Sequence, residues 1–178
     1  MSIVKIIKVP DVRLTEKCKK VAVHEAQTQQ TITDLIETLE NAKNPEGAGL
    51  AAPQIGVMRR ICIVRRFIPD PTNPDNTLKE NYVLVNPEII QASAETDVRY
   101  EGCLSIPDTY GPVERSKRIK IRALNRGGEE IKMNASGFFA RVIQHEVDHL
   151  NGVLFTTKLA GKTLTEKELD ELIEAENS

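Results

Sequence analysis

The segment 137–151 constrains the fold most strongly, because apolar residues recur along it at helical spacing. One face of the expected helix would hold Phe138, Val142, His145 and His149, and a second face would hold Phe139, Ile143, Val147 and Leu150. A helix that is apolar around much of its girth is normally buried, so this helix is expected at the centre of the fold. It should end at Gly152, since glycine is the favoured residue just beyond a helix C-terminus.

Two of the three histidines in the chain lie within this helix, four residues apart, with a glutamate between them. His145 and His149 would point the same way, one turn apart, and two imidazoles in a buried helix need polar partners. A divalent metal would supply them, with Glu146 placed to take a proton from a metal-bound water. Alternatively, both histidines bond to backbone or carboxylate groups, and Glu146 is an ordinary surface acid.

The remaining elements indicate an α+β protein with mostly antiparallel sheets packed around that central helix. We expect an N-terminal helix at 31–43 and a C-terminal helix at 165–178, which begins with a Thr165/Glu168 capping box. Strands are expected at 60–64 and at 82–90, the second with a break at Pro87, and a loop is expected at 66–81. The segments 117–124 and 130–135 should form a hairpin. The chain has 178 residues, which suits a single domain spanning residues 1–178.

Composition excludes several classes of protein. The net charge of −2 gives no general attraction to nucleic acid or to anionic membranes. No segment approaches the roughly 18 apolar residues of a membrane span, and the first residues do not resemble a secretory signal. The three cysteines are scattered and odd in number, which favours a reducing cytosol over a disulfide framework. We therefore expect a cytoplasmic protein.

A catalytic metal site of the zinc type needs a third protein ligand, which the helix does not supply. The extended motif of the metzincins is excluded, because Phe155 stands where their last histidine would be. Glu168 and Glu171 lie at distances that suit a downstream ligand, although Glu168 also fits a capping role. Cys103 is the remaining soft ligand, but most free cysteines behave as small buried hydrophobes. These residues alone also leave open a structural metal module and a Cys103 nucleophile.

Three segments together resemble the three signature motifs of the peptide deformylase family, in that family's order and spacing. They are GAGLAAPQ at 47–54, EGCLS at 101–105 and QHEVDH at 144–149. The similarity extends from PDVRL at 10–14 through VNP at 85–87 to GVLF at 152–155. It implies an enzyme that removes the N-formyl group from the initiator methionine of new polypeptides and releases formate. The alternatives are an HExxH metallopeptidase and a catalytically decayed homologue.

The resemblance also implies roles for individual residues. Cys103, His145 and His149 would hold one divalent metal ion, natively Fe²⁺, with Zn²⁺, Ni²⁺ or Co²⁺ able to replace it. Glu146 would be the general acid/base, and Gln54 and the backbone N–H of Leu104 would stabilise the oxyanion. The expected substrate contacts are Ala48, Gly49, Glu101, Gly102, Phe138, Arg141 and Val142. Glycine at 47 and 49 would let a peptide backbone come close, as an added strand.

The implied partners are N-formylmethionyl nascent peptides, in a bacterial cytoplasm rather than an organelle matrix, since no transit peptide is visible. No membrane or specific nucleic acid is expected as a partner. In some deformylases a basic C-terminal helix is thought to dock on the ribosome. Here residues 165–178 contain six acids and one base, so this helix would be repelled by rRNA phosphates. Any transient ribosome contact should use another surface.

Overall fold

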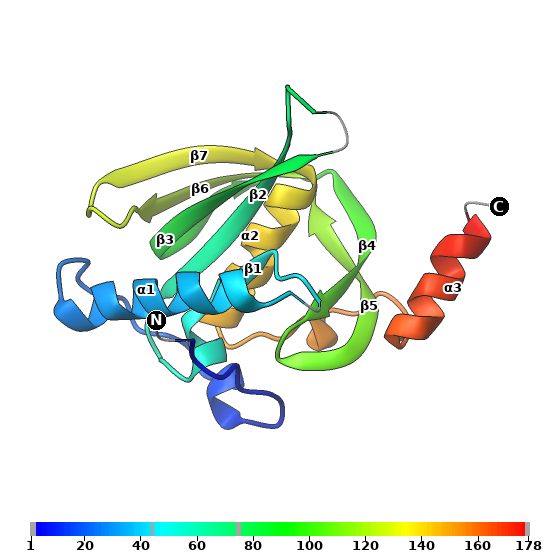
Figure 1. Cartoon of the computed structure of the whole chain (residues 1–178), viewed down its shortest axis with the longest axis horizontal. Coiled ribbons are helices and arrows are strands. Elements are labelled where there is room, and N and C mark those ends of the chain that lie inside the picture. The colour runs from blue at the N-terminus through cyan, green and yellow to red at the C-terminus, as the bar shows by residue number, and fades with distance from the viewer. Residues whose placement is uncertain (1–2, 44, 74–75, 177–178) are drawn as a thin grey trace.

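Five antiparallel strands form the main sheet in the order β1-β2-β3-β6-β7, and β4 and β5 form a separate antiparallel pair (Figure 1). The computed structural model describes residues 3–43, 45–73 and 76–176. The strands are β1 (Gly49–Ala51), β2 (Ile61–Pro69), β3 (Thr77–Ala92), β4 (Thr96–Cys103), β5 (Ile106–Ser116), β6 (Arg118–Leu124) and β7 (Glu130–Ser136). The helices are α1 (Ala26–Asn41), α2 (Gly137–Leu150) and α3 (Glu166–Glu176), with 3₁₀ turns at Val12–Thr15, Ala52–Ile55 and Phe155–Thr157. The predicted α+β class is confirmed.

The strand β2 lies between two helices, which explains why the segment RICIV is apolar without alternation. Successive side chains of a strand point to opposite faces. Ile61 and Ile63 pack in one cluster with α1, whereas Cys62 and Val64 pack in another with α2. Helix α2 therefore packs against the inner face of the main sheet, between that sheet and the β4–β5 pair (Figure 1). This is the central position that its apolar pattern predicts.

The C-terminus of α2 is fixed by a glycine and a buried cation. Gly152 has a φ of 73°, the left-handed conformation expected of a residue just beyond a helix end. The buried Arg60 guanidinium donates to the carbonyl of Leu150 at 3.4 Å and to Oδ1 of Asn151 at 2.8 Å. It also donates to the carbonyl of Pro87 at 2.8 Å. A cation here complements the helix dipole and ties the last turn of α2 to the sheet.

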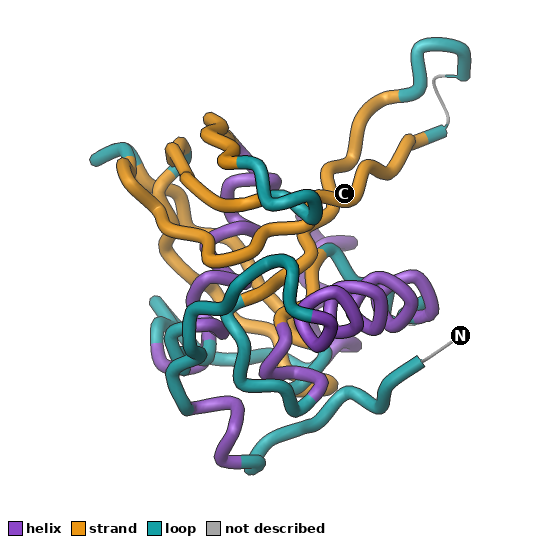
Figure 2. The backbone as a smooth tube through the Cα atoms, turned by 90° about the vertical axis from the view of Figure 1, so that its left-hand side faces the viewer, coloured by secondary structure: helices purple, strands orange, loops and turns teal. Residues whose placement is uncertain are grey.

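The segment 66–81 was predicted as a loop, but both of its ends belong to strands, because β2 extends to Pro69 and β3 begins at Thr77. The ladder between β2 and β3 continues to the pair Pro69↔Thr77, so the hairpin projects from the body of the molecule (Figure 2). Proline is tolerated there because Pro69 closes the strand and does not interrupt it. Pro74, which contributed to the loop prediction, lies outside the described residues. The break predicted at Pro87 is confirmed as a register shift between Val85 and Glu88.

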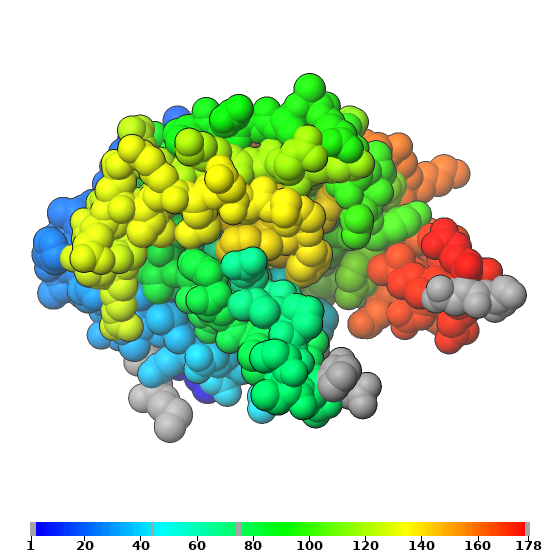
Figure 3. Space-filling view, turned by 90° about the horizontal axis from the view of Figure 1, so that it is seen from above, coloured from blue at the N-terminus to red at the C-terminus, as the bar shows by residue number. Residues whose placement is uncertain are grey.

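Helix α3 forms a projection at one end of the molecule (Figure 3). Its capping box is present, because Thr165 donates to Glu168 Oε2 through its backbone N–H at 2.7 Å and its hydroxyl at 2.8 Å. None of its residues is buried. Of the predicted segment 165–178, residues 177 and 178 lie outside the described residues. Among the described helices, none is both long and apolar enough to cross a bilayer.

Candidate active site and metal centre

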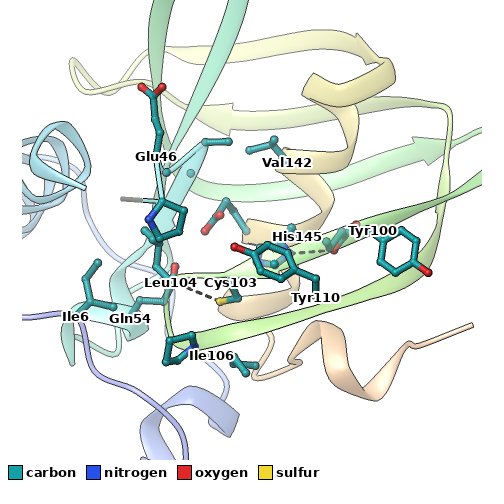
Figure 4. Close-up of a pocket in the computed structure, with 18 of the residues that line it drawn as sticks. Ile6, Glu46, Gln54, Tyr100, Cys103, Leu104, Ile106, Tyr110, Val142 and His145 are labelled. Carbon is teal, nitrogen blue, oxygen red and sulfur yellow. Dashed lines mark hydrogen bonds and ion pairs between the residues drawn. The ribbon is translucent and has the colours of Figure 1, made fainter. Parts of the chain in front are cut away.

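One cavity of about 570 Å³ is lined by every site residue predicted from the sequence except His149, which is buried (Figure 4). Three elements meet there: the segment around β1, the end of β4 and the middle of α2. The edge strands β1 and β4 belong to different sheets, and α2 brings them together. Residues separated by about 100 positions in the chain therefore share one chamber.

Cys103, His145 and His149 each present one ligand atom, and these atoms all lie within 4.8 Å of one another. Cys103 is the last residue of β4, directly before the tight turn at Leu104 that leads into β5. The two histidines occupy successive turns of α2. The Sγ atom of Cys103 is 3.2 Å from Nε2 of His149. In the part of the chain that the structure describes, this is the one such group of three.

The chemistry of these donors fits a divalent metal. Two buried side-chain atoms beside the group, Oε2 of Glu146 and Nδ1 of His149, have no hydrogen-bond partner among the described residues. Buried polar atoms are rarely left without a partner unless a ligand or water serves them. One thiolate and two imidazoles suit a metal of intermediate softness, and three protein ligands leave a fourth position for water or substrate.

The pKa shifts of the three cysteine thiols distinguish the candidate ligand Cys103 from Cys18 and Cys62. Burial disfavours a Cys103 thiolate, but His149 and His145 outweigh this effect and hold the pKa of the thiol well below its usual value. Burial raises the pKa of Cys18 to about 11 and raises that of Cys62 well above the ordinary value. A thiolate is the form that binds metals, so only Cys103 is prepared for that role.

Glu101 orients His145. Its Oε2 lies 3.0 Å from Nδ1 of His145, which leaves Nε2 of that ring as the ligand atom. Burial opposes the charge on Glu101, but hydrogen bonds from His145 and Arg115 hold its pKa well below the usual range. Arg115 donates to both carboxylate oxygens at 2.9 Å, and Arg141 donates to Oε1 at 2.8 Å. The carboxylate thus links His145, a candidate metal ligand, to a buried ion cluster.

This cluster changes the expectation for two residues. Glu101 and Arg141 do line the cavity, but Arg141 is only 4% exposed and its guanidinium is already engaged. Besides Glu101, it donates to Oδ1 of Asp97 at 2.7 Å and to the carbonyl of Val113 at 2.9 Å. Substrate contact by Glu101 and Arg141 stays a prediction. The sequence had not indicated their structural role, because the partners come from three different elements, β4, β5 and α2.

Replacing Glu101 with glutamine is expected to destabilise the protein by about 3–5 kcal/mol, because two buried arginines would lose a charged partner. Replacement of the charged acceptor at Nδ1 of His145 by a neutral amide should also weaken metal binding by about 10–100-fold. Glu95→Gln is the matched control, since Glu95 is half exposed in its ion pairs and should contribute less than about 1 kcal/mol. Urea unfolding and metal competition measure both effects, and equal destabilisation by the two variants would contradict the prediction.

Gln54 is held with its amide nitrogen toward Cys103, one of the candidate metal ligands. Its Oε1 accepts a hydrogen bond from the backbone N–H of Ala51 at 2.8 Å. Its Nε2 then lies 3.5 Å from Sγ of Cys103 and 3.3 Å from Oγ of Ser105. Leu104 lines the same cavity from the tight turn between β4 and β5. Both predicted oxyanion donors therefore lie near the possible metal site, Gln54 through its contact with Cys103 and Leu104 as the residue that follows Cys103.

Glu146 is 3% exposed, and burial raises the pKa of its carboxyl to about 7 against the opposing effect of the two histidines. A carboxyl group with a pKa near neutrality can both accept and return a proton, which suits a general acid/base.

Phe155, at the position where a metzincin would have a histidine, instead stacks on the His145 ring with centroids 6.2 Å apart.

The outer part of the cavity includes residues that sequence reasoning missed. They are Ile6, Lys8, Glu46, Tyr100, Ile106, Asp108, Tyr110 and Glu166. Half of them are on the hairpin of β4 and β5, which was not predicted because charged residues interrupt its alternating pattern. Phe138 lies at the mouth with 52% exposure, whereas Val142 is nearly buried deeper inside.

Three protein ligands beside a buried glutamate are typical of a metal-dependent hydrolase, because structural sites usually close with four protein ligands. Comparison with known proteins specifies the family. The model for polypeptide deformylase matches residues 3–164, and the chain belongs to that family.

Individual relatives agree with this assignment. The peptide deformylase of Halothermothrix orenii is 42% identical over 159 residues, covering 89% of this chain and 95% of that protein. A class I type b peptide deformylase from Acinetobacter baumannii, solved with Met-Ala-Ser bound, has a TM-score of 0.77 at 35% identity, covering 89% of this chain and all of that one. The Thermotoga maritima enzyme has a TM-score of 0.77 at 36% identity, covering 90% of this chain and all of that one.

Proposed function

We propose that this deformylase removes the N-formyl group from N-terminal formylmethionine through a metal held by Cys103, His145 and His149. The observation that carries the proposal is the convergence of these three ligand atoms within 4.8 Å, beside a buried glutamate and at a cavity. The products are formate and a free N-terminal amine. A metallopeptidase with a downstream ligand leaves Cys103 without a role, and a decayed homologue gives no reason for an intact Glu146 beside the three ligand atoms.

The native metal is proposed to be Fe²⁺, with Zn²⁺, Ni²⁺ or Co²⁺ able to occupy the same ligands. A thiolate with two imidazoles accepts each of these ions, so supply in the cell influences which is bound. The chemistry that such an ion supplies when bound is a lowered pKa of coordinated water and polarisation of the formyl oxygen.

The protein's own groups then manage protons and charge. Glu146 accepts the proton of the attacking water and passes it to the nitrogen of the leaving amine. The Nε2 group of Gln54 and the backbone N–H of Leu104 donate to the negative charge that develops on the formyl oxygen. The anchoring of Gln54 by Ala51 supports this role, because a donor fixed in advance needs no reorganisation during reaction.

The peptide is proposed to lie as an added strand between β1 and β4. Each of these strands is at the edge of its sheet, and Ala48, Gly49 and Gly102 line the cavity between them. An edge strand offers unpaired backbone groups to an extended peptide. The methionine side chain would enter beside Phe138 and Val142. The bound Met-Ala-Ser in the related Acinetobacter baumannii protein supports a peptide ligand of this kind.

The decisive test is formate release from formyl-Met-Ala-Ser by protein purified anaerobically and loaded with Fe²⁺. We expect release with multiple turnovers, and no acetate release from acetyl-Met-Ala-Ser, whose methyl group enlarges the reacting centre. Loading with Zn²⁺, Ni²⁺ or Co²⁺ should change the rate but not the product. Absence of formate from fully metal-loaded protein would favour the decayed homologue.

We further propose that residues 1–178 act as one catalytic domain in a bacterial cytoplasm, and that α3 does not mediate ribosome contact. Deletion of residues 165–178 should change the free energy of unfolding by less than about 1 kcal/mol, because no α3 side chain is buried. Co-sedimentation with ribosomes should be the same for both proteins. Ribosome binding that disappears on truncation would contradict this prediction.

A further inference from the structure

Gly49 of β1 lies directly against the side chain of Glu146. A Cβ atom added at Gly49 would be 2.5 Å from Oε1 of Glu146 and 2.8 Å from both its Cδ and its Cγ. These are the three nearest atoms, and all belong to that one side chain. Real Cβ atoms essentially never come this close to another atom. The glutamate therefore occupies the space that any other residue at position 49 would fill.

Conformation does not explain the glycine. Gly49 lies in a β-strand and pairs with Val64, and its φ is outside the left-handed range in which glycine is favoured. An L residue could adopt this backbone without strain. Gly56 and Gly152 differ, because their φ values of 78° and 73° require glycine on conformational grounds. Glycine at position 49 is therefore explained by the lack of space for a side chain beside Glu146.

This revises the reason expected from the sequence, which was close approach of a peptide backbone. A peptide strand beside β1 would meet backbone groups at position 49, and those groups are the same in glycine and alanine. The missing side chain instead makes room within the protein, on the side of the strand that faces α2.

We propose that Gly49 is a positioning residue for Glu146: its lack of a side chain lets the carboxylate lie between β1 and the metal ligands. This inference rests on the proposed function, in which Glu146 moves the proton. The carboxylate is buried and lies close enough to Cys103 and both histidines to interact with their charges, so it has little alternative space. A methyl group at position 49 would displace the carboxylate without disturbing Cys103, His145 or His149.

Gly49→Ala should therefore lower kcat by about 100-fold, the loss typical of a catalytic group displaced by about 1 Å. The metal content should remain at wild-type level, and KM for formyl-Met-Ala-Ser should change less than about threefold, because the backbone groups of β1 are retained. Gly127→Ala is the matched control. Gly127 lies in the β6–β7 turn, and its added Cβ would make only an ordinary contact with Asn125 at 3.4 Å, so activity should be unchanged.

A double-mutant cycle with Glu146→Ala tests whether the effect passes through the carboxylate. Alanine lacks the Cγ, Cδ and Oε1 atoms that the added methyl group would meet, so Gly49→Ala should lower the residual activity by less than about threefold in that background. Equal losses in both backgrounds would overturn the proposal, and so would wild-type kcat in Gly49→Ala. Glu146→Ala distinguishes failure of the proposed catalytic role of Glu146 from failure of the positioning role of Gly49. Full activity of Glu146→Ala would contradict the catalytic role. An inactive Glu146→Ala together with a fully active Gly49→Ala would contradict only the positioning role.

Discussion

Glu146→Gln is expected to lower the turnover of formyl-Met-Ala-Ser by about 1,000-fold while the protein keeps its metal, because general acid–base catalysis contributes roughly 10²–10⁴-fold. Glutamine has the same shape but cannot accept the proton. Glu146 is not among the three grouped ligands, so their arrangement should survive the change. Its burial raises the pKa to about 7, and the substitution removes that titrating group. Formate release and metal content, measured on the same preparation, check both parts of the prediction.

The control is Glu168→Gln, which changes the glutamate that an HExxH metallopeptidase would use as its downstream ligand. Glu168 accepts hydrogen bonds from Thr165 in an exposed capping box, so it has another task. The variant should retain full activity and metal. The metallopeptidase alternative would be favoured if Glu168→Gln lost its metal while Glu146→Gln kept both its metal and normal turnover.

Local patterns predicted the elements whose signals lie within a few residues of each other. The helix α2 was predicted with its stop at Gly152, and the β6–β7 hairpin and the α3 capping box were predicted in place. The three motifs also identified residues that the fold gathers around one cavity. Periodicity and capping are properties of neighbouring residues, so a single sequence contains them.

What the sequence did not reveal depends on contacts between distant segments. Arg115 and Arg141 appear as ordinary charges until β5 and α2 place both on Glu101. Tyr110 lines the cavity because β5 pairs with β4, and its backbone also pairs with Leu164. Gly49 resembled a substrate-facing glycine until the structure placed Glu146 against it. Each of these relations is set by packing, which no local pattern encodes.

Cys103→Ala is expected to abolish both metal binding and deformylation, the largest combined effect in the molecule. The variant leaves two histidines, which are one ligand short of a catalytic site. Metal that binds only the native state adds stability, so the wild type should show a metal-dependent rise in Tm that the variant lacks. Metal analysis after dialysis and thermal unfolding with and without added Zn²⁺ measure these changes.

Cys62→Ala provides the matched control, since Cys62 is buried in the core cluster and its thiol stays protonated. This change removes one buried sulfur and should cost about 1–2 kcal/mol through the small cavity it leaves, with metal content unchanged. If Cys103→Ala kept its metal, the third ligand would lie elsewhere in the chain and the Cys–His–His assignment would be wrong. If Cys62→Ala alone lost the metal, the ligand thiol would be Cys62 on β2. That result would contradict the expectation from the pKa values, which the two histidines lower for Cys103 and burial raises for Cys62.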